Sequence, residues 1–144
     1  MSEEIIEIKS FSQEIYQFIC KLTKQLSPKA VVPSEEDFCK MLEDSGFHLF
    51  VIQNDNGLPV GMLTVVIYQT PSGRKAWIED VVVDERVRGQ GYGKMLMRHS
   101  IDYCGNTGAN TISLTSNPSR IEANKMYQSL GFHIYETNVY KIVY

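Results

Sequence analysis

The stretch from Trp77 to Lys94 constrains the fold more than any other part of this chain. It begins with an apolar, β-branched run, Ile78-Glu79-Asp80-Val81-Val82-Val83, and later reaches Arg88-Gly89-Gln90-Gly91-Tyr92-Gly93-Lys94, after which a helical pattern starts. Three glycines at alternate positions free this backbone from Cβ atoms wherever φ must be positive or a ligand must come close. The stretch therefore predicts a strand, a glycine-rich turn and a helix.

A loop of this kind suits a phosphate or pyrophosphate group. The first turn of the following helix has N–H groups without intrahelical partners and carries a partial positive charge. Spacing excludes two common phosphate loops. Counted from Gly89, the dinucleotide fingerprint needs glycine at its sixth position, where Lys94 stands. The Walker pattern needs glycine in place of Arg88 and Ser or Thr in place of Met95, so it fails twice.

Two motifs resemble signatures of the GCN5-related N-acetyltransferase (GNAT) family. The first is Arg88-x-x-Gly91-x-Gly93 directly after a β-branched strand, which looks like that family's loop for the diphosphate of acetyl-coenzyme A. The second is a helical Tyr127 followed four residues later by Gly131-Phe132. The resemblance implies an enzyme, an acyltransferase that moves an acetyl group from acetyl-CoA directly to a primary amine.

The resemblance also implies which residues contact acetyl-CoA. Amides of the glycine loop would hold the pyrophosphate, and the pantetheine arm would pair with the valine run where the fourth and fifth strands separate. The N–H of Val82 or Val83 would polarise the thioester carbonyl. Many family members have asparagine where this chain has Arg120, and Asn117 or Asn124 beside it could reach the cofactor, although capping and solvent exposure are comparable roles for them. The predicted cofactor-binding residues are Val81, Val82, Val83, Arg88, Gly89, Gln90, Gly91, Tyr92, Gly93, Lys94, Asn117 and Asn124.

Tyr127 and Glu79 are the candidate catalytic residues. A phenol stays protonated at neutral pH, because its ordinary pKa is about 10, and can therefore protonate a departing thiolate. An ammonium group must lose a proton before it attacks, and a carboxylate within an apolar strand is a natural acceptor, directly or through water. Both residues also have plainer interpretations. Tyr127 lies on the apolar stripe of its helix, and carboxylates in half-buried strands are often solvated or salt-bridged.

Strict alternation along the strand separates Glu79 from its neighbour Asp80. A period of two places Glu79 on one face of the sheet, with Trp77, Val81 and Val83, and places Asp80 on the other. The two carboxylates therefore cannot serve one site unless the strand contains a bulge.

The rest of the chain predicts an α/β (α+β) fold in a single domain over residues 1–144. Strands are expected at residues 47–53, 60–68 and 75–83, and short turns between them make an antiparallel meander. A helix separates the last of these from a strand at 111–115, so this pair is expected to be parallel, in one βαβ crossover. With an opening strand at residues 5–8 and closing strands at 132–136 and 139–144, the sheet is mixed, mostly antiparallel and twisted, with six to seven strands.

About four helices are expected on the faces of this sheet. Ser10 or Ser12 can cap the first, and Ser34 begins a capping box for the second, which Gly46 ends. The third follows the glycine loop. Asn117-Pro118 can start the fourth, with Ser119 and Glu122 as a rival cap.

The amino-acid composition limits the expected cellular location and binding partners of the protein. No apolar run reaches the ~18 residues of a membrane span, and the acidic start Met1-Ser2-Glu3-Glu4 does not resemble a signal peptide, so a cytoplasmic protein without membrane association is expected. A net charge of −3 and the lack of a Lys/Arg run argue against nucleic acid. The cysteines and histidines share no metal-ligand spacing, so no metal site is predicted.

The acceptor is the least constrained part of the prediction. A small-molecule amine is expected, bound between the first two helices, the Pro28–Pro33 loop and the turn at Asn138. A protein α-amine or lysine is the alternative with the same chemistry. A non-catalytic acyl-CoA sensor is the alternative from another class, because a fold does not determine a function. A homodimer is left open as an assembly.

Overall fold

A computed structural model describes residues 2–144, which divide into two compact units at the boundary between Leu114 and Thr115. The first unit contains a five-stranded sheet with the order β1-β2-β3-β4-β5. The first four strands pair antiparallel and β4 pairs parallel with β5, which confirms the meander and the single crossover. The strands are β1 (Glu4–Ile8), β2 (Phe47–Gln53), β3 (Pro59–Thr70), β4 (Gly73–Val83) and β5 (Thr111–Ser113).

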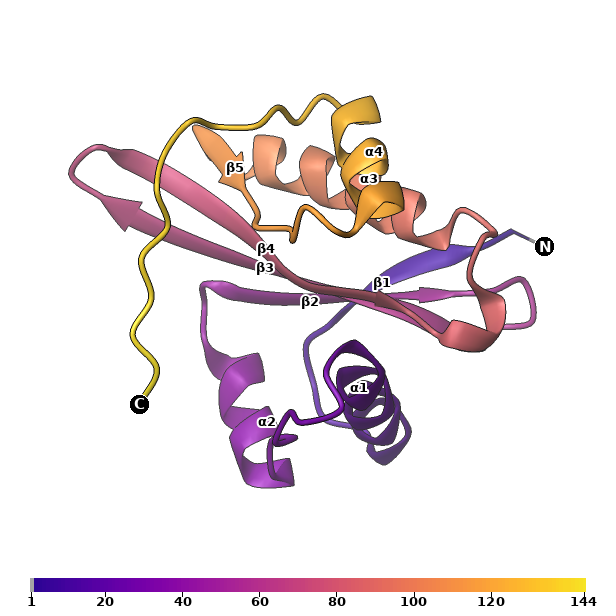
Figure 1. The fold of residues 1–144 in the computed structure, drawn as a ribbon. Coiled ribbons are helices and arrows are strands. Elements are labelled where there is room, and N and C mark those ends of the chain that lie inside the picture. The colour runs from indigo at the N-terminus through magenta and orange to yellow at the C-terminus, as the bar shows by residue number, and fades with distance from the viewer. Residues whose placement is uncertain (1) are drawn as a thin grey trace. The chain divides into compact units, whose positions relative to one another are not determined.

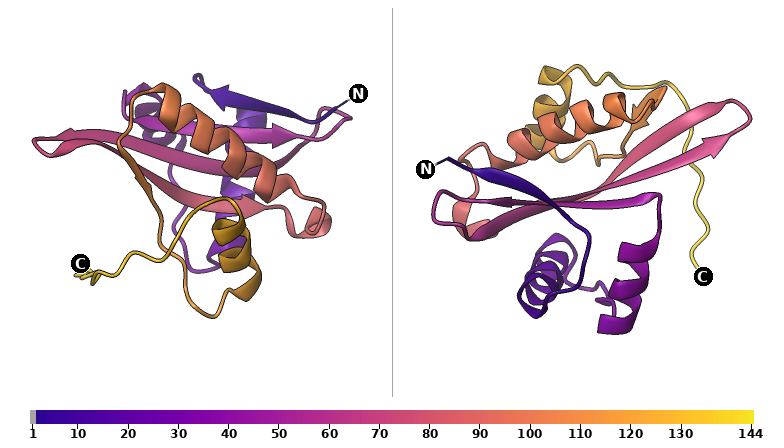
Figure 2. Two further views of the ribbon diagram at one scale, coloured as in Figure 1. Left: turned by 90° about the horizontal axis from the view of Figure 1, so that it is seen from above. Right: turned by 180° about the vertical axis from the view of Figure 1, so that it is seen from behind.

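Three helices of the first unit cover the two faces of this sheet. α1 (Gln13–Leu26) and α2 (Glu35–Glu43) lie on one face, and α3 (Tyr92–Asn106) lies on the other, as Figures 1 and 2 show. Ser12 and Ser34 cap α1 and α2 as expected: their hydroxyls accept hydrogen bonds from the N–H groups of Ile15 (3.2 Å) and Asp37 (3.1 Å). Among the described residues, no helix is long and apolar enough to cross a bilayer.

Two apolar layers hold the helices on the sheet. Beneath α1 and α2, side chains of both helices pack on inward-facing residues of β2, β3 and β4. On the opposite face the ring of Phe50 meets the rings of His99 and Tyr103 of α3 edge-on. Helix α3 comes so close to β3 that a Cβ on Gly61 would lie 3.2 Å from Leu96 Cδ1. The buried residues of the first layer are Ile8, Phe18, Ile19, Leu22, Phe38, Leu49, Val51, Met62 and Val82.

A β-bulge interrupts the alternation of β4. Thr64 of β3 stands opposite Glu79, and Met62 stands opposite Val82, so two residues of β4 face the single Leu63. One of the two is Asp80, a non-glycine residue with φ = 52°. The bulge shifts the inward and outward pattern by one position, and the expected placement of Glu79 and Asp80 on opposite faces is therefore wrong.

The second unit contains α4 (Ile121–Ser129) and, in the part of the chain described, no strand. The sheet therefore has five strands, and the prediction of six to seven was wrong, because the segments 132–136 and 139–144 form no ladder. Their alternating apolar residues show strand propensity, but a strand also needs an edge that accepts its hydrogen bonds. The proposed caps of α4 were also wrong: the helix begins after Arg120, and Asn117 Oδ1 instead accepts from the Ser119 N–H (2.9 Å) in the preceding turn.

Candidate active site

The loop between β4 and α3 presents a row of unpaired backbone donors. A short 3-10 helix, η1 (Glu85–Val87), leads into it, and Gly89 and Gly91 have φ values of 81° and 86°. A Cβ on either glycine would meet nothing within 4 Å, so the space above the loop is open. The first hydrogen bond of α3 runs from Met95 N–H to Gly91 C=O (3.0 Å). Within residues 2–144, the N–H groups of positions 89–94 meet no protein acceptor.

A buried carboxylate supports this loop from below. Asp84 is 3% exposed and accepts hydrogen bonds from Lys21 Nζ (2.9 Å) and from Arg86 Nη2 (2.9 Å). These hydrogen bonds hold the pKa of the Asp84 carboxyl well below its usual range, and the bond from Arg86 has the largest effect. Gln25 Oε1 also accepts from the Glu85 N–H (3.0 Å). Sequence reasoning missed this link between α1 and the loop, although an aspartate that directly follows a buried valine strand is a usable signal.

The C-terminal half of β4 has one edge that pairs with no other strand of the described chain. The β4–β5 ladder contains three pairs and ends at Trp77 and Ser113, so the strands separate beyond this point. The Asp84 N–H donates to Val60 C=O of β3 (2.8 Å). Peptide groups alternate along a strand, and those of Val83 therefore point toward the free edge. There the Val83 carbonyl accepts from Arg88 Nε (3.1 Å), which ties that side chain to β4.

The bulge brings Glu79 and Asp80 to one face of the sheet. Thr64, which stands opposite Glu79, and Asp80 both line a cavity on the side of α1 and α2. Partial desolvation, and then the negative charge of Asp80, raise the pKa of the Glu79 carboxyl above its ordinary value. In the described chain neither carboxylate forms an ion pair with Lys, Arg or His within 4.0 Å. Sequence reasoning singled out Glu79 and missed Asp80 as a residue of this cavity.

The cavity has a volume of about 350 Å³ and a mostly apolar lining. Its walls come from α1, α2 and the connection between them, and its floor comes from β2, β3 and β4. The sequence predicts the acceptor between the first two helices and the Pro28–Pro33 loop, which contribute to this lining, and at the turn of Asn138, which does not. The lining residues are Ile19, Thr23, Leu26, Ser27, Ala30, Val31, Pro33, Phe38, Met41, Phe47, Leu49, Met62, Thr64 and Asp80.

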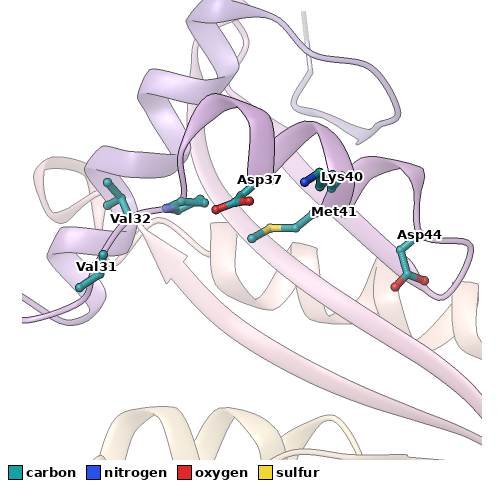
Figure 3. A pocket seen from close by; sticks show the side chains of 7 residues that line it. Val31, Val32, Asp37, Lys40, Met41 and Asp44 are labelled. Atoms are coloured by element: carbon teal, nitrogen blue, oxygen red, sulfur yellow. The ribbon is translucent and has the colours of Figure 1, made fainter.

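A second, broader hollow of about 590 Å³ lies along α2, as Figure 3 shows. Val31, Pro33 and Met41 line both spaces, so the hollow adjoins the cavity. It carries charges of both signs, from Lys40 and from the carboxylates of Asp37 and Asp44.

The remaining predicted site residues belong to the second unit. Tyr127 is 6% exposed, its ring meets that of Phe132 edge-on with centroids 6.3 Å apart, and its carbonyl accepts from the Phe132 N–H (3.1 Å). The motif Tyr-x-x-x-Gly-Phe thus forms the end of α4 and the turn after it. Asn124 Nδ2 donates to the carbonyls of Asn117 (2.9 Å) and Arg120 (2.8 Å), so both asparagines organise the turn before α4.

Comparison with known proteins finds relatives both in sequence and in fold. The chain is 36% identical over 63 residues to the uncharacterized N-acetyltransferase YhdJ of Bacillus subtilis (strain 168), an alignment that covers 43% of this chain and 44% of that protein. Among solved structures, the aminoglycoside acetyltransferase meta-AAC0020 from an uncultured soil metagenomic sample, in complex with sisomicin, has a TM-score of 0.83 at 21% identity over 99% of this chain and 95% of that one. Aminoglycoside N-acetyltransferase AAC(6')-Iy in complex with CoA has a TM-score of 0.79 at 20% identity over 98% and 94% of the two chains.

A family model matches most of the chain. The model is that of the Acetyltransferase (GNAT) family, and it matches residues 12–132, which include the glycine loop, β4 and the Tyr127 motif. Together with the sheet order and the single crossover, this match identifies the chain as a member of the Acetyltransferase (GNAT) family.

Proposed function

We propose that residues 1–144 form a single acetyltransferase domain that moves an acetyl group from acetyl-CoA to the primary amine of a small molecule. The observation that carries the proposal is the open loop at residues 89–94, whose N–H groups have no protein acceptor in the described chain. Unpaired amides at a helix N-terminus bind phosphate groups well, because the donors and the helix dipole favour negative charge.

The residues present fit acetyl-CoA at two further places. The free edge of β4 offers the peptide groups of Val83 beside the loop, where an extended pantetheine arm can pair as a strand would. Open space above Gly89 and Gly91 lets a pyrophosphate approach the backbone. The proposed contacts are Val81, Val82, Val83, Arg88, Gly89, Gln90, Gly91, Tyr92, Gly93 and Lys94, with Asn117 and Asn124 from the second unit.

The proposed chemistry divides among a few groups of the chain. When bound, acetyl-CoA supplies the acetyl group as an activated thioester. Of the two predicted donors, Val82 and Val83, the N–H of Val83 faces the free edge, and we assign to it the hydrogen bond to the carbonyl oxygen as that oxygen gains negative charge. Glu79 takes a proton from the ammonium group, directly or through water, and the amine nitrogen then bonds to the carbonyl carbon while the carbon–sulfur bond breaks. Tyr127 Oη gives its proton to the departing sulfur, and the second proton that nitrogen loses as the amide forms returns to the Tyr127 oxygen, directly or through water, which balances the step.

A small molecule is the preferred acceptor because the cavity is confined. Its volume of about 350 Å³ is close to the lower end of the range for pockets that enclose small ligands. A structural relative is described in complex with sisomicin, which supports a small amine as the acceptor class. A protein amine or lysine would need a groove with space for flanking residues.

Two glycine variants test the loop, because the chain offers a matched control. Gly91 and Gly57 have φ values of 86° and 78°, and a Cβ on either would meet nothing within 4 Å. Gly91→Ala and Gly57→Ala therefore carry a similar backbone strain, on the order of 1 kcal/mol. We expect Gly91→Ala to weaken acetyl-CoA binding at least tenfold in isothermal titration calorimetry, and Gly57→Ala to leave it unchanged.

Transfer is tested by release of free CoA thiol with amines and with peptides. We expect turnover of small amines above that of peptide α-amines and lysines, and a fall in kcat for Tyr127→Phe with acetyl-CoA affinity retained. Failure of the wild-type protein to bind acetyl-CoA would refute the proposal. Tight binding without transfer to any amine would identify an acyl-CoA sensor instead.

A further inference from the structure

The cavity beneath α1 and α2 combines a neutral lining with a single charge. Fourteen residues line it, and of these only Asp80 is ionisable. Ten of the fourteen are apolar, and the Thr23 hydroxyl is already used in a hydrogen bond to Ile19 C=O (2.7 Å). Ser27 and Thr64 are the other polar side chains of the lining. A ligand in this space therefore meets mostly hydrocarbon and one carboxylate.

The backbone of Asp80 is held in an unfavourable conformation that exposes this carboxylate to the cavity. A φ of 52° is the left-handed region, which non-glycine residues seldom adopt, although Asp and Asn tolerate it better than most. The bulge opposite Leu63 imposes the conformation. Strain of this kind is found most often at binding and catalytic sites.

The charge of Asp80 has no counter-ion from the protein. Among residues 2–144, no Lys, Arg or His nitrogen lies within 4.0 Å of its carboxylate. The adjacent Glu79 lies on the same face of the sheet and adds a second negative charge. Both side chains are solvent-exposed, so water solvates their charges, and an ammonium group of a ligand in the cavity can approach two adjacent carboxylates without displacing a protein cation. In the adjoining hollow, by contrast, the lining includes a cation, Lys40, whose Nζ pairs with Glu36 (3.2 Å).

We propose that the acceptor is a primary amine on an apolar alkyl or aryl body, and that Asp80 binds its ammonium group. The proposal rests on the proposed function and names the substrate class of the same site. About 350 Å³ has room for roughly a dozen groups of water size, at about 30 Å³ each, so the body is small. Amino sugars with many ammonium and hydroxyl groups do not match this lining, because most of their polar groups would lose hydrogen bonds there.

Three small ligands test separately whether binding requires the positive charge and whether it requires the apolar body. 2-Phenylethylamine has both the charge and the apolar body, 2-phenylethanol lacks the charge, and ethanolamine lacks the body. We expect 2-phenylethylamine to bind the protein in the absence of acetyl-CoA at least tenfold more tightly than either analogue, measured by ligand-observed NMR. In the acetyl-transfer assay we expect its kcat/KM to exceed those of ethanolamine and sisomicin by at least tenfold.

Two aspartate variants test the role of Asp80. Asparagine keeps the shape of aspartate and tolerates the left-handed region, so Asp80→Asn removes the charge with little change in backbone strain. We expect Asp80→Asn to raise both the KM and the dissociation constant for 2-phenylethylamine about tenfold and to leave acetyl-CoA binding unchanged. Asp37→Asn, the same change in the adjoining hollow, should alter neither constant.

The opposite results of these assays would count against the substrate class, the role of Asp80 or the proposed function, depending on which assay fails. Faster acetylation of sisomicin or ethanolamine than of 2-phenylethylamine would overturn the substrate class and leave the proposed function intact. An unchanged amine affinity in Asp80→Asn would remove Asp80 from the site. Acetyl-CoA binding without transfer to 2-phenylethylamine would overturn the substrate class, whereas failure of the protein to bind acetyl-CoA would refute the proposed function at its cofactor step.

Discussion

Glu79 and Asp80 are consecutive residues of β4, yet both belong to the face of the sheet that α1 and α2 cover. An ordinary strand would separate them, and the extra residue opposite Leu63 brings them together. One carboxylate lines the cavity and the other lies beside it. In the proposed reaction, Asp80 binds the ammonium group and Glu79 accepts its proton.

The raised pKa of Glu79 predicts a change in the pH profile. A base works only when deprotonated, so kcat/KM should rise with pH through the Glu79 pKa, which lies above its ordinary value because of desolvation and the nearby Asp80. Glu79→Gln should lower kcat/KM by about 10²-fold or more and remove this acidic limb, leaving the dependence on the amine's own ionisation. Glu43→Gln, at the end of α2, serves as the control. An acidic limb that persists in Glu79→Gln would exclude Glu79 as the base.

The depressed pKa of Asp84 predicts a stability difference that depends on pH. The folded-state pKa lies below the unfolded value of about 3.9, so the ionised carboxylate stabilises the fold above that value, and this contribution is lost as pH falls toward the folded-state pKa. Asp84→Asn should lower the free energy of unfolding at pH 7 by about 2 kcal/mol, because charged hydrogen bonds from Lys21 and Arg86 are lost. Urea denaturation should show this difference shrinking below about pH 4. Asp55→Asn, in an exposed turn, should show no such trend.

Substitution by alanine should have opposite effects on the stability of the fold at Gly46 and at Gly105. A Cβ on Gly46 would lie 2.6 Å from the carbonyl oxygen of Ile67, whose N–H donates to Gly46 C=O (2.8 Å). Gly46→Ala should therefore cost about 1–3 kcal/mol, because two backbones must move apart. A Cβ on Gly105, in α3, would meet nothing within 4 Å, so Gly105→Ala should stabilise the fold by about 0.5–1 kcal/mol. Thermal denaturation that ranks the two variants equally would contradict this packing.

Burial of Cys104 predicts unequal reactivity of the cysteines. Its side chain is fully buried, and burial raises the pKa of the thiol to about 11. At pH 8 its thiolate fraction is on the order of one in a thousand, whereas Cys20 and Cys39 are partly exposed. Iodoacetamide should modify Cys20 and Cys39 first and reach Cys104 only in denaturant, as peptide mass spectrometry can show. Early labelling of Cys104 in the native protein would contradict the packing of α3 on the sheet.

Local patterns in the sequence were sufficient for most of the fold of the first unit. Hydrophobic spacing gave the helices, serine caps gave the starts of α1 and α2, and the order of strands and turns gave the meander and the crossover. These features depend on residues close together in the chain, so a short window contains their cause. The glycine loop was predictable for the same reason, because Gly89 and Gly91 occupy positions that require positive φ.

Features that depend on a partner segment could not be predicted in the same way. Segments 132–136 and 139–144 have the alternation of strands but form no ladder in the described structure, and that alternation does not reveal whether an edge is present to pair with. The place of Asp84 after a buried strand marks it as a residue of interest, but the sequence does not identify Lys21 as its partner, since 63 positions separate the two residues.

The sequence by itself determined the order of the elements, the glycine-rich loop and the family signatures, because each depends on neighbouring residues. Only the tertiary structure decided that Asp80 joins Glu79 on one face, since a bulge arises from the register of β3 against β4. It also decided that the cavity beneath α1 and α2 is mostly apolar with a single carboxylate, because its lining comes from α1, α2 and three strands that meet only when the chain folds.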